Sequence, residues 1–487
     1  MSSSQVSTLF DTVVEGGYCV GCGACAAVQD SPITMRLDSY GRYVAHLAAE
    51  PDAHDSSARV LEVCPFSPDG PNEDALGASL FGAAGQHDDR IGYHLGTYAG
   101  YVAEDGFRSR GSSGGMGSWL LTEFLRVGLV DRVAHVREHP PSDDDPALFR
   151  FELASTPQEV AAGGKSRYYP VELSGVLEAI RSIPGKYAVV GVPCFIKAVR
   201  RLAQQDPVLQ QRIRFAVAIF CGHLKSSRFA ESLAWQCGIP PDSIVSIDFR
   251  RKLPGRPANR YGVEITGRSD GHELHAVRPV QGLYGGNWGH GLFMYEACDY
   301  CDDVVGETAD VSVGDAWLPG YVEDSAGTNV VVVRNPEVQA LIEKGISSKR
   351  LALQPLDADG VAESQSAAFR HRRDGLAYRL HLKDQAQRWR PHKRVPPAVK
   401  HLTRKQRAIF RLRMQIAAHS HTAFQRALDA KRFDVFQVEI EPLLVAYARR
   451  GAPLGRFIWG RPRRMLRALV RGPARAARGV ISRRRAV

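Results

Sequence analysis

Three closely spaced cysteines near the N-terminus constrain the fold of this chain more than any other feature of its sequence. Cys19, Cys22 and Cys25 lie in the run C-V-G-C-G-A-C, and Cys64 follows in a C-P pair. Three thiolates at intervals of three can bind one side of a [4Fe–4S] cubane while a distant fourth completes the ligand set. The pattern predicts a small module held together by an iron–sulfur cluster.

Zinc and an unliganded core are the alternative roles for these cysteines. Zinc sites more often contain paired C-x2-C units, so the triple run favours iron and sulfide. Gly21 and Gly23 allow the backbone to fold tightly enough for its amides to face the sulfide ions. A bacterial ferredoxin has a C-x3-C spacing before its last cysteine, whereas 38 residues separate Cys25 from Cys64. Cys64 is therefore the least constrained ligand of the set.

A second group of four cysteines is expected at one edge of a sheet. Cys194 and Cys221 each end a predicted buried strand, and adjacent parallel strands end at the same sheet edge. Cys298 and Cys301, in C-D-Y-C, can then complete the ligands of a second cluster. The alternatives are small core residues at the strand ends and a thiol–disulfide pair in C-D-Y-C. Cys237, inside an apolar helix pattern, is expected to be a core residue.

Short apolar strands alternate with amphipathic helices over the middle of the chain, as in T-Y-A-G-Y-V-A, a Gly/Ser loop and W-L-L-T-E-F-L-R. This alternation predicts a mixed α/β fold with a largely parallel sheet and flanking helices. We expect an N-terminal ferredoxin-like iron–sulfur module before it and an α-helical extension after it. The predicted units are the module (1–80), the redox domain with the second cluster (90–346), the helical extension (347–450) and an Arg-rich tail (451–487).

The net charge of +11 describes the tail and not the body of the protein. Eleven arginines and no Lys, Asp or Glu lie in 451–487, so the rest of the chain is close to neutral. A specific nucleic-acid-binding surface is therefore not indicated. The tail fits an interfacial helix on an anionic membrane and, equally well, a disordered basic segment with weak nucleic-acid contacts.

The expected compartment is the cytoplasm, with the tail as a route to peripheral membrane attachment. No run of 18 or more apolar residues and no signal-peptide pattern occurs in the sequence. Thiols stay reduced in the cytoplasm, so nine cysteines point to metal or redox chemistry rather than to disulfides.

A glycine-rich loop at 111–118 lies between a predicted strand and a predicted helix. Free amides and the helix dipole at such a position favour an anionic phosphate group. The loop has neither the P-loop spacing nor the G-x-G-x-x-G spacing, so a turn without any ligand is the competing interpretation.

An ordered set of motifs covers residues 15 to 345: C-V-G-C-G-A-C, S-S-G-G-M-G-S, G-G-K-S-R-Y, G-V-P-C, F-C-G-H, C-D-Y-C and A-D-V-S-V-G-D-A-W. In this order they resemble the coenzyme F420 hydrogenase/dehydrogenase beta-subunit family, which includes 7-hydroxymethyl chlorophyll a reductase. The resemblance implies FAD and [4Fe–4S] clusters as cofactors. It also implies that the FAD site contains Ser113, Gly114, Gly115, Gly117, Lys165, Tyr168, Asp315 and Trp317.

The chemistry of single residues agrees with these roles but does not require them. Lys165 could supply positive charge to a phosphate and Trp317 a stacking face, or they could be a solvated loop charge and a core residue. His223, next to Cys221, is expected to satisfy backbone groups.

Three functions follow from this reading. The first is an iron–sulfur flavoprotein oxidoreductase that passes electrons between [4Fe–4S] clusters, FAD and coenzyme F420 or a similar hydride carrier. The second is a ferredoxin-dependent FAD reductase of a small organic substrate. The third is a non-enzymatic, metal-stabilised scaffold whose basic tail binds a membrane or a partner. The expected partners are a redox carrier, F420 or ferredoxin, and a protein partner subunit.

Overall fold

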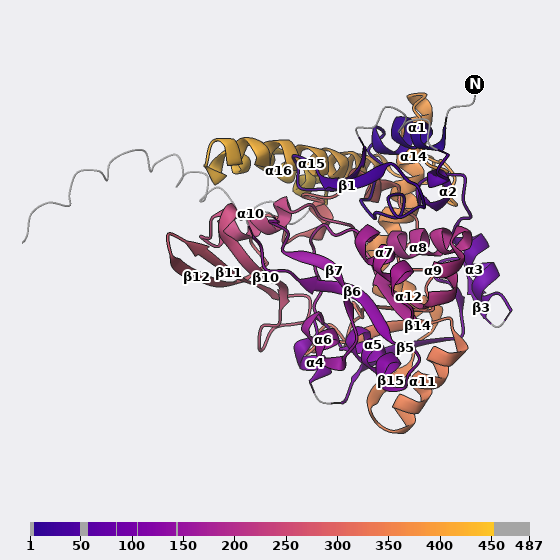
Figure 1. Ribbon diagram of the computed structural model, residues 1–487. Coiled ribbons are helices and arrows are strands. Elements are labelled where there is room, and N and C mark those ends of the chain that lie inside the picture. The colour runs from indigo at the N-terminus through magenta and orange to yellow at the C-terminus, as the bar shows by residue number, and fades with distance from the viewer. Residues whose placement is uncertain (1–3, 49–56, 84, 105, 143–144, 452–487) are drawn as a thin grey trace, which may run out of the picture.

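An eight-stranded mixed sheet forms the centre of the protein (Figure 1). The computed structural model describes residues 4–48, 57–83, 85–104, 106–142 and 145–451. The four strands β13, β9, β8 and β6 pair in parallel, and antiparallel strands extend the sheet on both sides. In sheet order the strands are β15 (Leu351–Pro355), β5 (Gly96–Val102), β14 (Asn329–Val333), β13 (Val311–Asp315), β9 (Ile213–Ile219), β8 (Tyr187–Gly191), β6 (Arg132–Glu138) and β7 (Phe149–Ala154).

Helices cover both faces of this sheet because successive strand residues point to opposite sides. Val133 and Ala188 pack with α5 (Met116–Arg126) and α11 (Pro336–Ser347) on one face. Their neighbours Ala134 and Val189 pack with helices on the other face. The helices of that second face are α7 (Ser174–Ser182) and α8 (Pro193–Gln205), and α12 (Ala358–Ser364) packs against β14 beside them.

The N-terminal module packs against α7 and α8. Arg181 on α7 donates a 2.6 Å hydrogen bond to the carbonyl oxygen of Ala27, and buried Arg201 on α8 donates to the carbonyl oxygens of Gly70 and Pro71. The module contains α1 (Gln5–Leu9), the hairpin of β1 (Ile33–Leu37) and β2 (Tyr43–Leu47), α2 (Val60–Val63) and α3 (Glu73–Phe81). A short hairpin of β3 (Gln86–Asp88) and β4 (Gly92–His94) follows.

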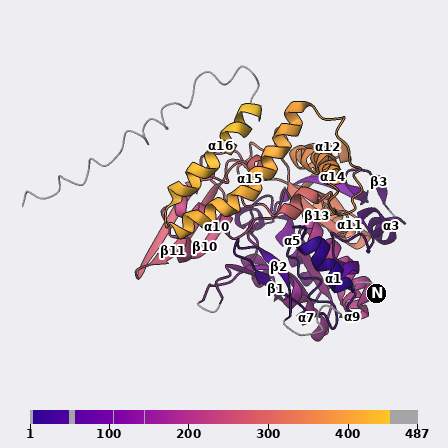
Figure 2. The ribbon, with the colours of Figure 1, turned by 90° about the horizontal axis from the view of Figure 1, so that it is seen from above.

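A second, three-stranded antiparallel sheet carries the C-terminal helices. Its strands are β10 (Ile244–Arg251), β11 (Gly262–Ser269) and β12 (His272–Pro279). Helices α15 (Arg404–Asp429) and α16 (Phe433–Gly451) lie side by side (Figure 2) and share a hydrophobic cluster with this sheet and α10 (Arg228–Gln236). The remaining helices are α4 (Phe107–Arg110), α6 (Pro157–Ala162), α9 (Pro207–Arg212), α13 (Ser366–Arg370) and α14 (Leu376–Gln385).

The predicted mixed α/β class and the helical C-terminal region are confirmed, with differences in detail. Strands β10 and β11 belong to the separate antiparallel sheet and not to the main sheet. The main sheet continues to β15, beyond residue 346. Cys237 is buried in a hydrophobic cluster, as expected.

Cys194 does not end a strand, which corrects the sequence-based assignment. Strand β8 ends at Gly191, and Pro193 begins α8, so Cys194 lies in the first helical turn. Proline favours this first position because its missing N–H has no partner there in any case. Within the described ranges, no helix has the length and apolar character needed to span a membrane. The Arg-rich tail lies outside the described residues from position 452 onward.

Candidate functional site

The Gly-rich loop, which leads into α5, is held by hydrogen bonds to residues around the start of β14. Ser113 donates a 2.9 Å hydrogen bond to the carbonyl oxygen of Thr328, and the Asn329 side chain accepts a 3.0 Å bond from the Met116 amide. Gly115 has φ of 90°, and a Cβ there would lie 2.7 Å from the backbone of Phe107. The loop therefore requires glycine at this position.

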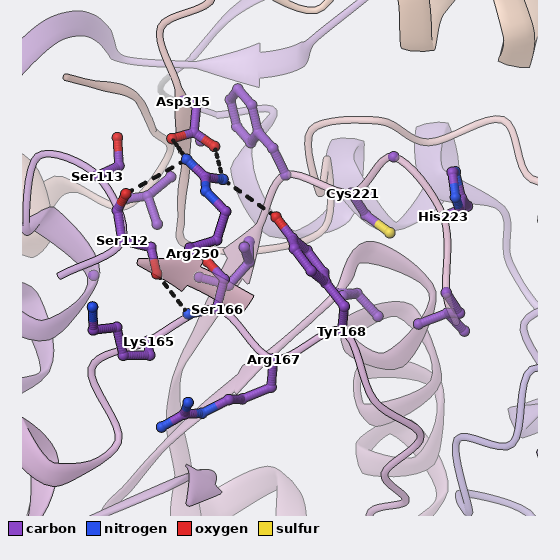
Figure 3. A pocket seen from close by; sticks show the side chains of 18 of the residues that line it. Ser112, Ser113, Lys165, Ser166, Arg167, Tyr168, Cys221, His223, Arg250 and Asp315 are labelled. Atoms are coloured by element: carbon purple, nitrogen blue, oxygen red, sulfur yellow. Dashed lines mark hydrogen bonds and ion pairs between the residues drawn. The ribbon is translucent and has the colours of Figure 1, made fainter. Parts of the chain in front are cut away.

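A cavity of about 690 Å³ opens beside this loop (Figure 3). Seven of the eight residues predicted for the FAD site line it, and they come from three separate segments of the chain. Those seven are Ser113, Gly115, Gly117, Lys165, Tyr168, Asp315 and Trp317. Gly114, in the middle of the loop, does not line the cavity, and a Cβ there would be 2.8 Å from Gly100 and Asn329. Its role is close backbone packing rather than contact with the cavity.

Arg250 ties the predicted residues together in the cavity wall. Its guanidinium donates to both carboxylate oxygens of Asp315 at 3.0 Å and to the Tyr168 hydroxyl at 3.2 Å (Figure 3). Burial acts to lower the pKa of Arg250, but Asp315 outweighs it and raises that pKa above its ordinary value. Trp317 lies alongside, with the guanidinium carbon 5.3 Å from its ring centroid.

Two other cations near the loop also have carboxylate partners. Lys165, considered above as a phosphate ligand, forms a 2.8 Å ion pair with Asp248. Arg167 forms a 2.9 Å ion pair with Glu138. Positive charge at this end of the cavity is therefore partly compensated by the protein itself.

The far end of the cavity contains Cys221, His223 and Lys225. His223 lies against Trp288, with the ring centroids 4.5 Å apart, and its buried Nε2 has no hydrogen-bond partner among the described residues. The role expected for His223 was satisfaction of backbone groups, whereas the ring faces the cavity. Burial and the neighbouring Lys225 lower the pKa of His223 well below its ordinary value, so the ring is neutral at pH 7.

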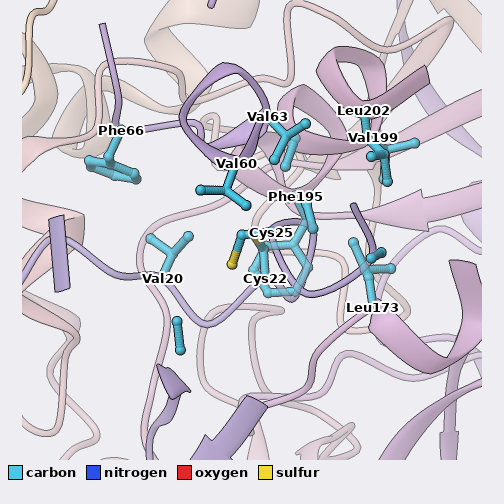
Figure 4. Packing of buried hydrophobic residues seen from close by; sticks show 14 of the residues in the cluster. Val20, Cys22, Cys25, Val60, Val63, Phe66, Leu173, Phe195, Val199 and Leu202 are labelled. Atoms are coloured by element: carbon cyan, nitrogen blue, oxygen red, sulfur yellow. The ribbon is translucent and has the colours of Figure 1, made fainter. Parts of the chain in front are cut away.

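The first cysteine set is brought together in the N-terminal module. Burial raises the pKa of the Cys25 thiol, and the nearby thiols of Cys22, Cys19 and Cys64 raise it further. Figure 4 shows Cys22 and Cys25 among apolar side chains from α2, α8 and the start of α7. Those side chains are Val20, Val60, Val63, Phe66, Leu173, Phe195, Val199 and Leu202.

The two glycines between these cysteines have the predicted tight conformation. Gly21 and Gly23 have φ of 69° and 80°, in the left-handed region. A Cβ on Gly23 would lie 2.3 Å from the carboxylate of Glu172, and one on Gly21 would lie 2.4 Å from the carbonyl oxygen of Tyr43. Any larger residue would displace the loop that carries the thiols.

The second cysteine set is also brought together. Burial raises the pKa of the Cys194 thiol, with further contributions from Cys301, Cys221 and Cys298. The backbone amide of Leu224 donates a 3.2 Å hydrogen bond to the Cys298 sulfur. Cys298 lies in a short 3-10 turn, Glu296–Tyr300, and Cys301 directly follows this turn.

The two sets adjoin each other through α8. The Cys22 thiol of the first set also raises the pKa of Cys194 in the second. Hydrogen bonds to sulfur and a buried, all-thiol donor set are features of iron–sulfur ligation. Over the described ranges, no group of three or more His, Cys, Asp or Glu side chains is arranged to hold a metal ion. The fit to a cluster therefore rests on the donor chemistry.

Several lining residues had no signal in the sequence. Arg250 lies in β10, Tyr261 lies in the loop between β10 and β11, and Trp288 lies in a turn after β12. Arg413 lies in α15. No motif surrounds any of them, and only the tertiary fold brings them to the cavity.

Comparisons with known proteins agree with the motif order. Residues 97–178 match the family model described as coenzyme F420 hydrogenase/dehydrogenase, beta subunit N-term, and residues 185–359 match its C-terminus counterpart. The chain is 24% identical over 214 residues to coenzyme F420 hydrogenase subunit beta of Methanococcus voltae, an alignment covering 42% of this chain and 66% of that protein. The alignment thus spans just under two thirds of that subunit.

The matches also include a second protein and a solved structure. An uncharacterized protein of Methanocaldococcus jannaschii is 23% identical over 361 residues, covering 69% of this chain and 89% of that protein. A chain of the F420-reducing [NiFe] hydrogenase complex from Methanosarcina barkeri aligns with a TM-score of 0.45 and 17% identity, over 65% of this chain and 100% of that chain.

Proposed function

Because this chain belongs to the coenzyme F420 hydrogenase/dehydrogenase beta subunit family, we propose that it is an iron–sulfur flavoprotein oxidoreductase. In this proposal two [4Fe–4S] clusters bind the two cysteine sets, and FAD binds in the cavity. F420 or a similar hydride carrier is the substrate. FAD would supply the exchange between one-electron and two-electron chemistry. The main support is that a single cavity is lined by both the Gly-rich loop and Cys221.

The Gly-rich loop is suited to a pyrophosphate group. The first turn of α5 presents backbone amides and the positive end of its dipole to the loop side of the cavity. A Cβ on Gly117 would meet only Val313, at 3.7 Å, so the space above this residue is open. Trp317, held beside Arg250, offers an aromatic face to a flat ring.

The order of the groups along the protein supports electron transfer between them. Cys221 lies at the cavity and belongs to the second cysteine set, and Cys194 of that set adjoins Cys22 of the first. Electrons could pass from the cavity to the second set and then to the first. Five of the eight thiols, including Cys22 and Cys221, are buried, whereas Cys19, Cys64 and Cys194 are partly exposed.

The test is an anaerobic, reconstituted preparation assayed for iron, acid-labile sulfide and flavin, followed by titration with reduced F420. We expect about eight iron per chain, bound FAD and bleaching of the flavin absorbance when F420 is oxidised. If the cofactors are bound and are reduced by ferredoxin but not by reduced F420, ferredoxin would take the place of F420 in this proposal. Zinc without flavin would support the metal-stabilised scaffold instead.

A matched pair of variants separates the flavin site from general damage. Gly117→Leu should fill the open space beside the loop and lower flavin content while iron stays unchanged. Gly175→Leu, at an exposed position of α7 where a new side chain meets nothing within 4 Å, should leave both contents unchanged. Full flavin content in Gly117→Leu would exclude the cavity as the flavin site.

The proposal includes a protein partner subunit and a peripheral role for the basic tail. The Methanococcus voltae relative is itself named as a subunit, which supports assembly with other chains. The eleven arginines of 451–487 would attach the protein to anionic membranes. A deletion of 451–487 that pellets with anionic vesicles as well as the full chain would remove this role.

A further inference from the structure

Arg372 is a buried arginine in the C-terminal region, beyond the last residue matched by the family models. It lies in a π-helical turn, His371–Gly375, between α13 and α14. The residue is only 1% exposed. A buried guanidinium is costly unless charges or hydrogen bonds compensate it, so its partners indicate what it serves.

The partners of Arg372 belong to the second cysteine set and its surroundings. One nitrogen, Nη1, donates a 3.1 Å hydrogen bond to the Cys301 sulfur and another hydrogen bond to the carbonyl oxygen of Asp303. The other, Nη2, donates at 3.0 Å to the carbonyl oxygen of Gly222, the residue after Cys221. Among the described residues, these hydrogen-bond acceptors are a sulfur and two carbonyls, not carboxylates.

We infer that Arg372 is a positioning residue that raises the reduction potential of the second cluster; this inference rests on the proposed function. Reduction adds one electron to the cluster and makes it one unit more negative. A fixed positive charge that donates to a ligand sulfur stabilises that reduced form more than the oxidised form. The C-terminal region thus acts on the redox centre directly, in addition to packing around it.

Nearby acidic groups limit this effect but do not cancel it. Asp303 follows the cysteine loop, and its carboxylate accepts three backbone amides, those of Val305, Gly306 and Glu307. Burial raises the pKa of the Cys301 thiol, and the charges of Asp302 and Asp303 raise that pKa further. Arg372 lowers it, and its effect is larger than that of either acid. The guanidinium is the charged group that donates a hydrogen bond to the sulfur.

The experiment is a redox titration of both clusters, followed by electron paramagnetic resonance, in the reconstituted full chain. Arg372→Gln should make one of the two midpoint potentials more negative, by at least a tenfold change in the equilibrium constant, which is 59 mV for one electron. Arg372→Lys, which keeps the positive charge but not the planar guanidinium with its several N–H donors, should shift the same midpoint by less. The midpoint potential of the first cluster should stay unchanged. Cys64→Ser, which removes a ligand of the first set, shows which of the two signals belongs to that cluster.

Arg334→Gln is the matched control, because Arg334 is equally buried but donates to oxygen atoms of Ser312, Ala309 and Ile91. It should lower stability without moving either potential. If Arg372→Gln loses its iron, the midpoint potentials of Arg372→Lys test the inference instead. Wild-type midpoints in whichever of these variants keeps both clusters would overturn the inference. A wild-type chain that binds no clusters would instead refute the proposed function.

Discussion

Replacing Arg394 by methionine should be among the most destabilising substitutions in the C-terminal region. The Arg394 side chain is 8% exposed and donates to both carboxylate oxygens of Glu307, at 2.7 and 2.8 Å. It also lies 2.7 Å from Asp74 on α3 and 3.5 Å from Asp302. One guanidinium therefore links the N-terminal module, the loop after the second cysteine set and the C-terminal region.

The magnitude follows from which acids would lose their partner. Asp302 would keep Lys393 at 3.4 Å, and the exposed pair with Asp74 is worth at most about 1 kcal/mol. Glu307, with a side chain 3% exposed, would lose both strong hydrogen bonds and keep, within the described part of the chain, only the cation of Arg373 at 4.0 Å. Leaving one buried carboxylate without its partner costs about 3–5 kcal/mol, so we expect a loss in that range.

Urea denaturation at pH 8, followed by circular dichroism and by cluster absorbance, measures this loss. Arg390→Met is the matched control, because Arg390 pairs with the partly exposed Asp384 and should cost no more than about 1 kcal/mol. The double variant Arg394→Met with Glu307→Gln removes both charges and should recover at least half of the loss. Equal stability of the two single variants, or no recovery in the double variant, would refute the reasoning.

Three further predictions concern the cysteines, the cavity and the pH dependence of stability. Cys64→Ala should halve the iron content whereas Cys237→Ala should not, and equal iron in both would reject Cys64 as a ligand. Arg250→Lys cannot pair with both oxygens of Asp315, so flavin fluorescence should report an about tenfold weaker binding of flavin, and unchanged affinity would contradict this. Burial lowers the pKa of His421 to about 4 in the folded protein. As the pH falls, the unfolded chain therefore binds this proton before the folded chain does. The free energy of unfolding should fall by about 1 kcal/mol between pH 7.5 and pH 5.5 for this reason. His421→Gln should remove that part of the pH dependence in urea titrations, and an unaltered profile would count against it.

The sequence predicted single elements better than their pairing. The apolar runs at 97–103 and 186–191 correspond to β5 and β8, because strands buried on both faces are continuously apolar. Strands β10 and β11 also contain buried apolar residues, but they form a separate sheet. Strand pairing depends on contacts between distant segments, and no local pattern specifies those contacts.

The second cysteine set shows how a grouping can be predicted from a partly wrong local structure. Cys194 was expected at a strand end but lies in the first turn of α8, and Pro193 is the signal that could have placed it there. The thiol still meets Cys221, because a helix that directly follows a parallel strand starts at the same sheet edge as the neighbouring strand's end. The predicted grouping of Cys194 with Cys221 depended only on their position at this sheet edge, and the structure places both residues there.

The buried arginines were out of reach of sequence analysis for a physical reason. A cluster requires several thiolates with short spacings, so the ligands leave a pattern in the chain. A guanidinium needs only proximity, and Arg372 reaches the Cys301 sulfur from 71 residues away. An isolated arginine in a charged helix pattern therefore reads as a surface residue until the fold supplies its burial. The spacing of cysteines therefore predicts a cluster from the sequence, whereas a buried arginine beside a cysteine sulfur becomes visible only in the structure.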